Sequence, residues 1–315
     1  MKKTIQRTAL LLFILMCTPR AGATELLIPV GKVIALELEN DCVTVAAFDG
    51  DGCGDLRIGD EIQAIDGREI DSAADVRCAL EKSDGAVEVE VLRGKETLRL
   101  RLTPQITADG PRLGVYLRQG VTGIGTVTYY DPDTGNFGAL GHGVNTPDGK
   151  PVEMEQGSAY AARVLSVRRG KAGQPGQLMG ALSAAEPLGA LSENTPMGVF
   201  GKCGGWSGQP MPTADAEDIR TGKATILSTI SGDTPQEYSV EILKIYADSD
   251  KTGRNLLLKV TDPQLLQTTG GIVHGMSGSP IIQDGKLVGA VTHVLVNDPT
   301  TGYGIFIENM LDAAA

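Results

Sequence analysis

Aromatic residues, histidines and basic runs are all scarce in this chain of 315 residues. Phe, Trp and Tyr make up 4% of the chain, so a core must be built mainly from Val, Ile, Leu and Ala. The net charge is −11 and there is no long basic segment, which argues against nucleic acid as a partner, because phosphate binding needs clustered Lys and Arg. The sequence lacks an H-E-x-x-H motif and a helix that starts with G-K-S. We therefore expect neither a metal site nor a bound cofactor.

The first 23 residues have the composition of a targeting segment. Basic residues at positions 2, 3 and 7 precede an apolar run from Ala9 to Cys17, and Ala21-Gly22-Ala23 fits a cleavage site. The apolar run is shorter than the roughly 20 residues that a comfortable membrane span needs. We expect export across a membrane, with residues 1–23 as a cleaved signal peptide or a retained membrane anchor.

The cysteines that follow this segment do not have the spacing of a zinc site. Three of them, Cys42, Cys53 and Cys78, fall in one short part of the chain. A Cys42–Cys53 disulfide is one interpretation, and buried free thiols are the other.

Residues 24–105 carry the pattern of a small β-rich domain. An L-x-x-G-D-x-I-x-x-I-x-G run at 56–67 precedes a helix that Ser72 would cap, and two alternating segments joined by a turn follow. This order resembles a PDZ domain, which binds an extended peptide by adding it to a sheet edge. The resemblance would place the peptide-binding segment at Lys32, Val33, Ile34 and Ala35, which departs from the usual G-L-G-F loop. Strand addition is then expected without a firm grip on a terminal carboxylate, and a packing domain without a ligand is the alternative.

Residues 106–315 read as a second domain built from strands. A turn-rich linker at 106–112 leads into short β-type segments separated by Gly and Pro turns, and no long amphipathic helix interrupts them from 151 to 260. This spacing predicts an all-β barrel or sandwich. The whole chain is therefore expected to be mainly β.

The stretch from Gly275 to Pro280 has the pattern G-x-S-G-x-P, followed by a hydrophobic strand. It resembles the nucleophile loop of chymotrypsin-like serine peptidases and makes Ser277 the candidate nucleophile. Glycines on this loop allow backbone conformations in which the amides of Gly275 and Ser277 point at one spot and form an oxyanion hole. Ser279 stands where those enzymes have a second glycine. An ordinary Gly/Ser turn is the competing interpretation.

A serine nucleophile needs a base, and the chain contains only three histidines. His142 lies between two glycines in a distant part of the chain, so it can approach Ser277 from another segment. His274 lies on the same turn as Ser277, and His293 lies in the strand that follows. Either of these two could instead be a buried or neighbouring histidine, and we favour His142.

The group that orients the base is expected to be a carboxylate. Asp262 ends a strand shortly before Ser277 and is the preferred candidate, although an Asp before Pro is often only a turn former. Its competitors are Asp215, Asp218, Asp233 and Asp248. The order His, Asp, Ser is that of the chymotrypsin-like enzymes rather than of subtilisin or the α/β-hydrolases.

Several strings resemble the stage IV sporulation protein B peptidase family: Gly141-His142-Gly143, the loop at 275–282, residues 289–294 and residues 296–305. The resemblance covers the export segment, a PDZ domain and a chymotrypsin-like peptidase domain. It implies the catalytic triad His142, Asp262 and Ser277. At position 274 the family is expected to have glutamine, whereas this chain has histidine.

The same resemblance implies a biological setting. A serine endopeptidase of this kind is exported from the forespore into the space between its two membranes. It cleaves itself and the regulatory partner of an intramembrane metalloprotease, which permits processing of pro-sigma-K. Two other functions stay open on the residues alone: an envelope quality-control peptidase with a PDZ domain, and a catalytically inert PDZ scaffold.

Overall fold

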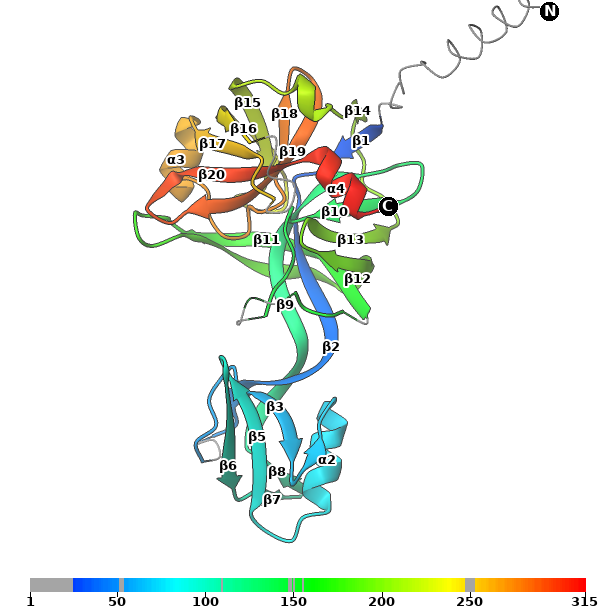
Figure 1. Ribbon diagram of the computed structural model, residues 1–315, viewed down its shortest axis with the longest axis vertical. Helices are drawn as coiled ribbons and strands as arrows, with labels where there is room; N and C mark the ends of the chain where they lie inside the picture. The colour runs from blue at the N-terminus through cyan, green and yellow to red at the C-terminus, as the bar shows by residue number, and fades with distance from the viewer. Residues whose placement is uncertain are drawn as a thin grey trace, which may run out of the picture.

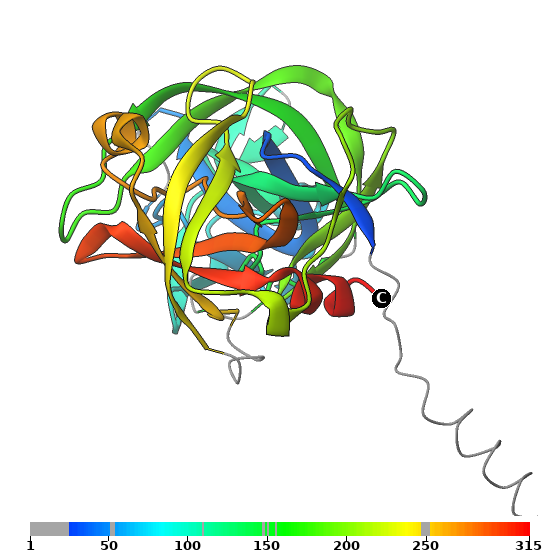
Figure 2. The ribbon, with the colours of Figure 1, turned by 90° about the horizontal axis from the view of Figure 1, so that it is seen from above.

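The computed structural model describes residues 25–50, 54–108, 110–146, 149, 151–154, 156–246 and 253–315. It is mainly β, as the sequence predicts. Two barrels lie at one end of the molecule and a smaller domain lies at the other (Figure 1). Seen from above, the yellow-to-red strands of the second barrel lie beside the green strands of the first (Figure 2).

The first barrel is a ring of antiparallel strands. Hydrogen bonding runs from β9 through β10, β13, β12, β11 and β2 and back to β9. The strands are β2 (Val33–Phe48), β9 (Val115–Tyr130), β10 (Asn136–Ala139), β11 (Gln156–Arg168), β12 (Gln177–Thr195) and β13 (Gly198–Cys203). Two short strands, β1 (Leu26–Pro29) and β14 (Met211–Pro212), extend the ring beside β9. In β2 the side chains of Ile34, Leu36 and Leu38 are buried, as expected for a strand with one face toward a core.

The second barrel is closed in the order β15-β16-β17-β20-β19-β18. Its strands are β15 (Gly222–Ser228), β16 (Gln236–Ile245), β17 (Leu256–Val260), β18 (Pro280–Gln283), β19 (Lys286–Leu295) and β20 (Asp298–Phe306). Three short helices accompany them: η1 (Ala216–Asp218), α3 (Pro263–Thr269) and α4 (Ile307–Ala313). Two separate barrels packed together form the architecture expected of a chymotrypsin-like peptidase. Ser277 lies just before β18, in the second barrel, and His142 follows β10 of the first.

The small domain is inserted into the first barrel. The far ends of β2 and β9 enter it, and between them come β3 (Glu61–Ile65), β4 (Arg68–Glu69), α2 (Ala73–Glu81), β5 (Val87–Arg93), β6 (Glu96–Leu102), β7 (Gln105–Thr107) and β8 (Gly110–Arg112). Its core is a separate cluster of buried aliphatic side chains, which includes Val43 of β2 and against which Leu117 of β9 packs. Ser72 caps α2 by accepting a hydrogen bond from the amide of Asp75, as predicted.

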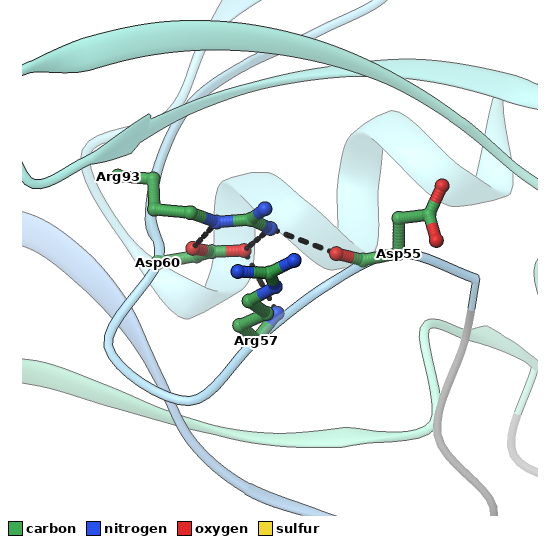
Figure 3. A network of polar contacts seen from close by, with 4 residues as sticks. All are labelled: Asp55, Arg57, Asp60 and Arg93. Atoms are coloured by element: carbon green, nitrogen blue, oxygen red, sulfur yellow. Dashed lines mark hydrogen bonds and ion pairs between the residues drawn. The ribbon is translucent and has the colours of Figure 1, made fainter.

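The L-x-x-G-D motif of the small domain builds a buried ion pair. Leu56 packs into the core, Gly59 has a φ of +92°, and the Asp60 side chain is 1% exposed. Arg93 donates to both oxygens of Asp60 at 2.7 and 2.8 Å, and the Arg57 amide donates at 2.8 Å (Figure 3). Burial acts to raise the pKa of Asp60, but these hydrogen bonds outweigh it and hold the pKa below its usual value. The motif therefore fixes the start of β3 against β5.

The insertion changes two expectations from the sequence. A boundary at residue 105/106 does not separate the domains, because β1 and the first half of β2 belong to the first barrel. The segment Lys32–Ala35 lies in this barrel and not in the small domain. The strand positions in it pair with β9 on one edge, and Ile34 and Ala35 also pair with β11 on the other, so no peptide can add there. The predicted position of the peptide-binding segment is therefore wrong.

The expected targeting segment at residues 1–23 and the Cys53 end of the Cys42–Cys53 disulfide lie outside the described residues. The described residues include no helix that is long and apolar enough to cross a membrane. Cys78 and Cys203 are free thiols.

Candidate active site

The loop that carries Ser277 is held between the two barrels. It belongs to the second barrel, but two buried threonines of β9 in the first barrel bind it. The Thr126 hydroxyl donates to the Gly275 carbonyl at 2.8 Å, and the Thr128 hydroxyl donates to the Gly278 carbonyl at 2.8 Å. The Thr126 amide also donates to the carbonyl of Ser277 at 2.9 Å. These bonds fix the serine relative to the barrel that supplies His142.

Two positions on this loop require glycine. Gly275 and Gly278 have φ values of +98° and +95°, a region that side chains with a Cβ rarely adopt. A Cβ at Gly278 would also lie 1.9 Å from the carbonyl oxygen of Thr126. The G-x-S-G pattern is thus a consequence of close packing between the barrels as well as of the turn.

The amides of the loop divide into bonded and unbonded ones. Those of Met276, Gly278 and Ser279 donate to the carbonyls of Val273, Val291 and Met276 at 3.1, 2.7 and 3.0 Å. Within the described part of the chain, the amides of Gly275 and Ser277 donate to no acceptor. These are the two amides that the sequence predicts for an oxyanion hole, and the geometry leaves both available.

The two serines of the loop have different surroundings. The Ser277 side chain is half-buried, and its hydroxyl donates to the carbonyl of Thr292 on β19 at 2.8 Å. Ser279 is fully buried and its hydroxyl is bonded to the hydroxyl of Ser228 at 2.9 Å. Only Ser277 is therefore placed to meet a substrate.

A tight turn brings His142 to the same strand. Leu140 and Gly141 have φ values of +69° and +66°, and a Cβ at Gly141 would lie 2.9 Å from Cγ2 of Thr292. The ring of His142 then lies beside the ring of His293, with 5.2 Å between the ring centroids. His142 and the Ser277 hydroxyl therefore both lie beside the same short part of β19, at His293 and Thr292, although no hydrogen bond joins the two among the described residues.

The tautomer of His142 follows from its hydrogen bond. Its Nδ1 lies 2.9 Å from the carbonyl oxygen of Gly143, which can only accept, so Nδ1 carries the proton. Burial lowers the pKa of His142, the bond to Gly143 partly opposes this, and the nearby charge of His274 lowers it further. His142 is therefore neutral near pH 7, with Nε2 free to accept a proton.

Asn194 at the end of β12 supports this arrangement and was not predicted from the sequence. Its side-chain oxygen accepts from the Val144 amide at 2.8 Å, and its nitrogen donates to the carbonyls of Val144 and Val152 at 2.8 and 2.9 Å. These bonds hold the segment that immediately follows His142 and Gly143. An asparagine near a strand end carries no signal of such a role in the sequence.

Asp262 does not reach His142 in the structure. It is the N-cap of α3, where one oxygen accepts from the Leu265 amide at 3.0 Å and the other from the Ser239 amide at 3.4 Å. No hydrogen bond or ion pair joins it to His142 in the described residues. The expected role as orienting carboxylate gives way to a capping role, because the start of α3 needs an acceptor for its free amides.

Of the four competing aspartates, the three that the structure describes take no such role either. Asp218 forms an ion pair with Lys286 at 2.9 Å, and Asp215 is the N-cap of η1. No bond to His142 is formed by Asp233, and Asp248 lies outside the described residues.

The remaining two histidines lie near the site. Burial, the charge of His142 and the charge of Arg254 lower the pKa of His293 to about 4, and its Nδ1 is buried without a partner among the described residues. His274 is exposed, and its backbone is bonded to Gly176 and Leu178 at 3.0 and 2.8 Å. No group of three His, Cys, Asp or Glu residues in the described chain could hold a metal ion.

The chain matches the model of one protein family. The family model described as SpoIVB peptidase S55 matches residues 110–311, most of the chain outside the N-terminal segment and the small domain. No curated protein matches the chain. Among solved structures, the active form of the Rv3671c protease from M. tuberculosis is 16% identical, with a TM-score of 0.39 over 61% of this chain and 72% of that one. Its inactive form is 15% identical, with a TM-score of 0.37 over 60% and 81% of the two chains.

Proposed function

The chain belongs to the SpoIVB peptidase S55 family and is a serine peptidase, and on this premise we propose that Ser277 and His142 form its catalytic pair. The observation that carries the proposal is the pair of unbonded amides at Gly275 and Ser277, on a loop whose other amides are bonded. Such a pair can stabilise the negative charge that develops on a carbonyl oxygen during acyl transfer.

The reaction follows from the groups in place. The Ser277 hydroxyl turns from the Thr292 carbonyl toward Nε2 of His142, gives it the proton and attacks the scissile carbonyl carbon. The amides of Gly275 and Ser277 bind the resulting oxyanion. His142 then donates its proton to the leaving amine as the carbon–nitrogen bond breaks. Water repeats the sequence on the acyl-enzyme and releases the serine.

A backbone carbonyl orients His142 in this proposal. The Gly143 carbonyl holds the proton on Nδ1, which is the task that a carboxylate has in the Ser-His-Asp triad. Asp262 is left out of the catalytic group, because both of its oxygens already accept hydrogen bonds from backbone amides. A carbonyl stabilises the imidazolium less than a carboxylate does, so the enzyme is expected to be slower than a triad peptidase.

The setting of the reaction extends the proposal. A peptidase acts on proteins, and the targeting composition of residues 1–23 supports export. The family supports a role in sporulation. The proposed enzyme works in the space between the two membranes around the forespore. There it cleaves itself and the regulatory partner of an intramembrane metalloprotease, which triggers pro-sigma-K processing.

The small domain is proposed to bind an extended peptide, as its PDZ-like motif order suggests. With Lys32–Ala35 enclosed in the first barrel, the candidate edge moves to β8, which packs beside α2. Among the described residues β8 pairs with β7 alone, so its other edge can accept a strand.

A time course of the full chain beside Ser277→Ala tests the proposed catalytic role. Intact mass should show self-trimming in the parent and none in the variant. Trimming at an equal rate in both would assign the cleavage to a contaminant and remove Ser277 from the mechanism. Adding the ectodomain of a sporulation membrane protein beside unfolded casein tests the substrate. Equal cleavage of both would favour a quality-control peptidase over a dedicated one.

A further inference from the structure

A cavity of about 340 Å³ lies beside the proposed oxyanion hole, and the reaction described above does not use it. Its lining comes from four separate segments: Ala35 of β2, Gly123 and Ile124 of β9, Leu178 of β12, and the pair His274 and Gly275 of the nucleophile loop. Gly275 thus contributes both to this cavity and to the proposed oxyanion hole. Whatever enters the cavity lies close to the reacting carbonyl.

The cavity exists because the first barrel is incompletely closed at this end. On β9 the pairing with β10 begins only at Val127, and on β12 the pairing with β13 begins only at Gly189. Before these points, in the described part of the chain, each strand has one edge without a neighbouring strand. Among the described residues, His274 alone bridges to this edge of β12, through one pairing with Gln177. A ligand can therefore lie between the two strands without displacing a sheet partner.

The open edge of β9 presents backbone groups toward the cavity. The Val127 amide donates to the Lys32 carbonyl at 2.9 Å, toward β2, whereas the Thr126 amide donates to the Ser277 carbonyl at 2.9 Å on the opposite edge. Alternate residues of a strand direct their backbone groups to the same edge. The amide and carbonyl of Ile124 consequently point to the edge that Ser277 occupies two residues further on, and an extended peptide can pair with them.

The walls of the cavity are partly apolar and partly polar. Leu178 is 1% exposed, and Ala35 and Ile124 are half-buried against the same core cluster. The polar groups are those of Thr122, Gln177 and His274, and no Asp, Glu, Lys or Arg lines the cavity. Arg168 donates a hydrogen bond to the side-chain oxygen of Gln177 at 3.1 Å, so that oxygen is already engaged. The apolar part of the wall suits an aliphatic side chain, and a basic side chain would find no acidic partner in the lining.

We propose that this cavity is a specificity subsite that takes an aliphatic side chain, such as Leu, Ile or Val, from a substrate residue within a few positions of the scissile bond. The substrate backbone pairs with Ile124 while its side chain packs on Ala35, Ile124 and Leu178. The inference rests on the proposed function, since it defines what that site selects.

Thr122 offers a way to fill the subsite. It lines the cavity, it is exposed, and its side chain lies on the same face of β9 as that of Ile124, because alternate residues of a strand point to one side. Thr122→Leu therefore extends a longer side chain on the cavity side of the strand. Gly204→Leu is the control, because a Cβ there would meet nothing within 4 Å and that glycine does not line the cavity.

The test maps the cleavage sites of the full chain on a tryptic digest of casein by mass spectrometry, with labelling of Ser277 by a fluorophosphonate run in parallel. The parent and Gly204→Leu should prefer an aliphatic residue at one position near the scissile bond. Thr122→Leu should lose about tenfold or more of that preference, with Gly or Ala favoured at the same position, and should label at the parental rate. An unchanged profile in Thr122→Leu, with labelling intact, would overturn the subsite and leave the catalytic pair standing.

Loss of labelling in the folded parent would instead contradict the proposed function. Where turnover is too slow to map, the same digest is added as a competitor of labelling, and the digest peptides retained by the protein are identified. The digest should slow labelling of the parent more than that of Thr122→Leu. Equal competition in the two proteins would overturn the subsite.

Discussion

The side chain of Asn194 forms two hydrogen bonds of 2.8 Å with the backbone of Val144, one to its amide and one to its carbonyl. Val144 follows the glycine whose carbonyl fixes the tautomer of His142. A residue that touches neither the substrate nor the reacting atoms thus holds the general base in place, and we regard Asn194 as a positioning residue.

Asn194→Ala should lower kcat by about 100-fold with little change in KM, because a base that is misplaced by about 1 Å loses that much rate. The variant removes the partners of the Val144 amide and the Val152 carbonyl, so a lower unfolding free energy is also expected. Asn194→Asp keeps the bond from the Val144 amide and should lie between Ala and the parent. Asn297→Ala, at an exposed position, is the control and should match the parent. In Asn194→Ala, activity per milligram could instead fall only as far as the folded fraction falls, with kcat per folded molecule unchanged. That result would leave Asn194 with a purely structural role.

The charge of His274 lowers the pKa of His142, which predicts the direction of a pH effect. Activity requires neutral His142, so the acidic limb of the profile follows its pKa. In His274→Gln the positive neighbour is gone, the pKa of His142 rises, and the acidic limb should move to higher pH. The rate of Ser277 labelling by a fluorophosphonate as a function of pH measures this directly. Gln177→Ala, an uncharged neighbour of His274, should leave the limb in place, and a limb that moves to lower pH would contradict the assignment of His142.

Gly278→Ala should abolish activity and destabilise the fold. The new Cβ would lie 1.9 Å from the Thr126 carbonyl oxygen, at a φ of +95°, so the loop must leave the strand that holds it. We expect a loss of about 3 kcal/mol or more in unfolding free energy, measured by urea titration. Gly285→Ala has a similar φ of +76° but open space around its Cβ, and should cost about 1 kcal/mol. Similar losses at the two positions would show that strain alone, without the inter-barrel contact, decides the need for glycine.

Breaking the buried ion pair of the small domain should lower the free energy of unfolding more than breaking an exposed ion pair does. Arg93→Met leaves the carboxylate of Asp60, which is 1% exposed, without its main partner and should lower the unfolding free energy by more than Arg99→Met does. Arg99→Met breaks the exposed pair with Glu90 and should cost less than about 1 kcal/mol. Urea unfolding followed by the small domain's own signal measures both. Equal costs would mean that water reaches Asp60 as easily as it reaches Glu90.

The sequence predicted the parts of this molecule that depend on local pattern. Alternating hydrophobic residues indicated strands, Ser72 and its helix were read from capping rules, and the G-x-S-G-x-P pattern identified a loop with the expected unbonded amides. The family was likewise predicted from short strings and is confirmed by the match over residues 110–311. Strands, helix caps and tight turns depend on residues close together in the chain, so they can be predicted from the sequence.

Contacts between segments far apart in the chain could not be predicted from the sequence. The pairing of β2 with both β9 and β11 encloses Lys32–Ala35, and nothing in those four residues reports which strands flank them. The contacts of Thr126 and Asn194 with the site come from strand ends far apart in the sequence. The helix cap at Asp262 was visible as an Asp-Pro pair, but its competition with a catalytic role became apparent only from the hydrogen bonds it makes.

We propose that Ser277 is the nucleophile. Covalent labelling by a fluorophosphonate, with the labelled residue located by peptide mass mapping, tests this assignment most directly. One adduct is expected on Ser277 in the parent, the same adduct in Ser279→Ala, and none in Ser277→Ala or His142→Ala. An adduct on Ser279, or none on the folded parent, would contradict it.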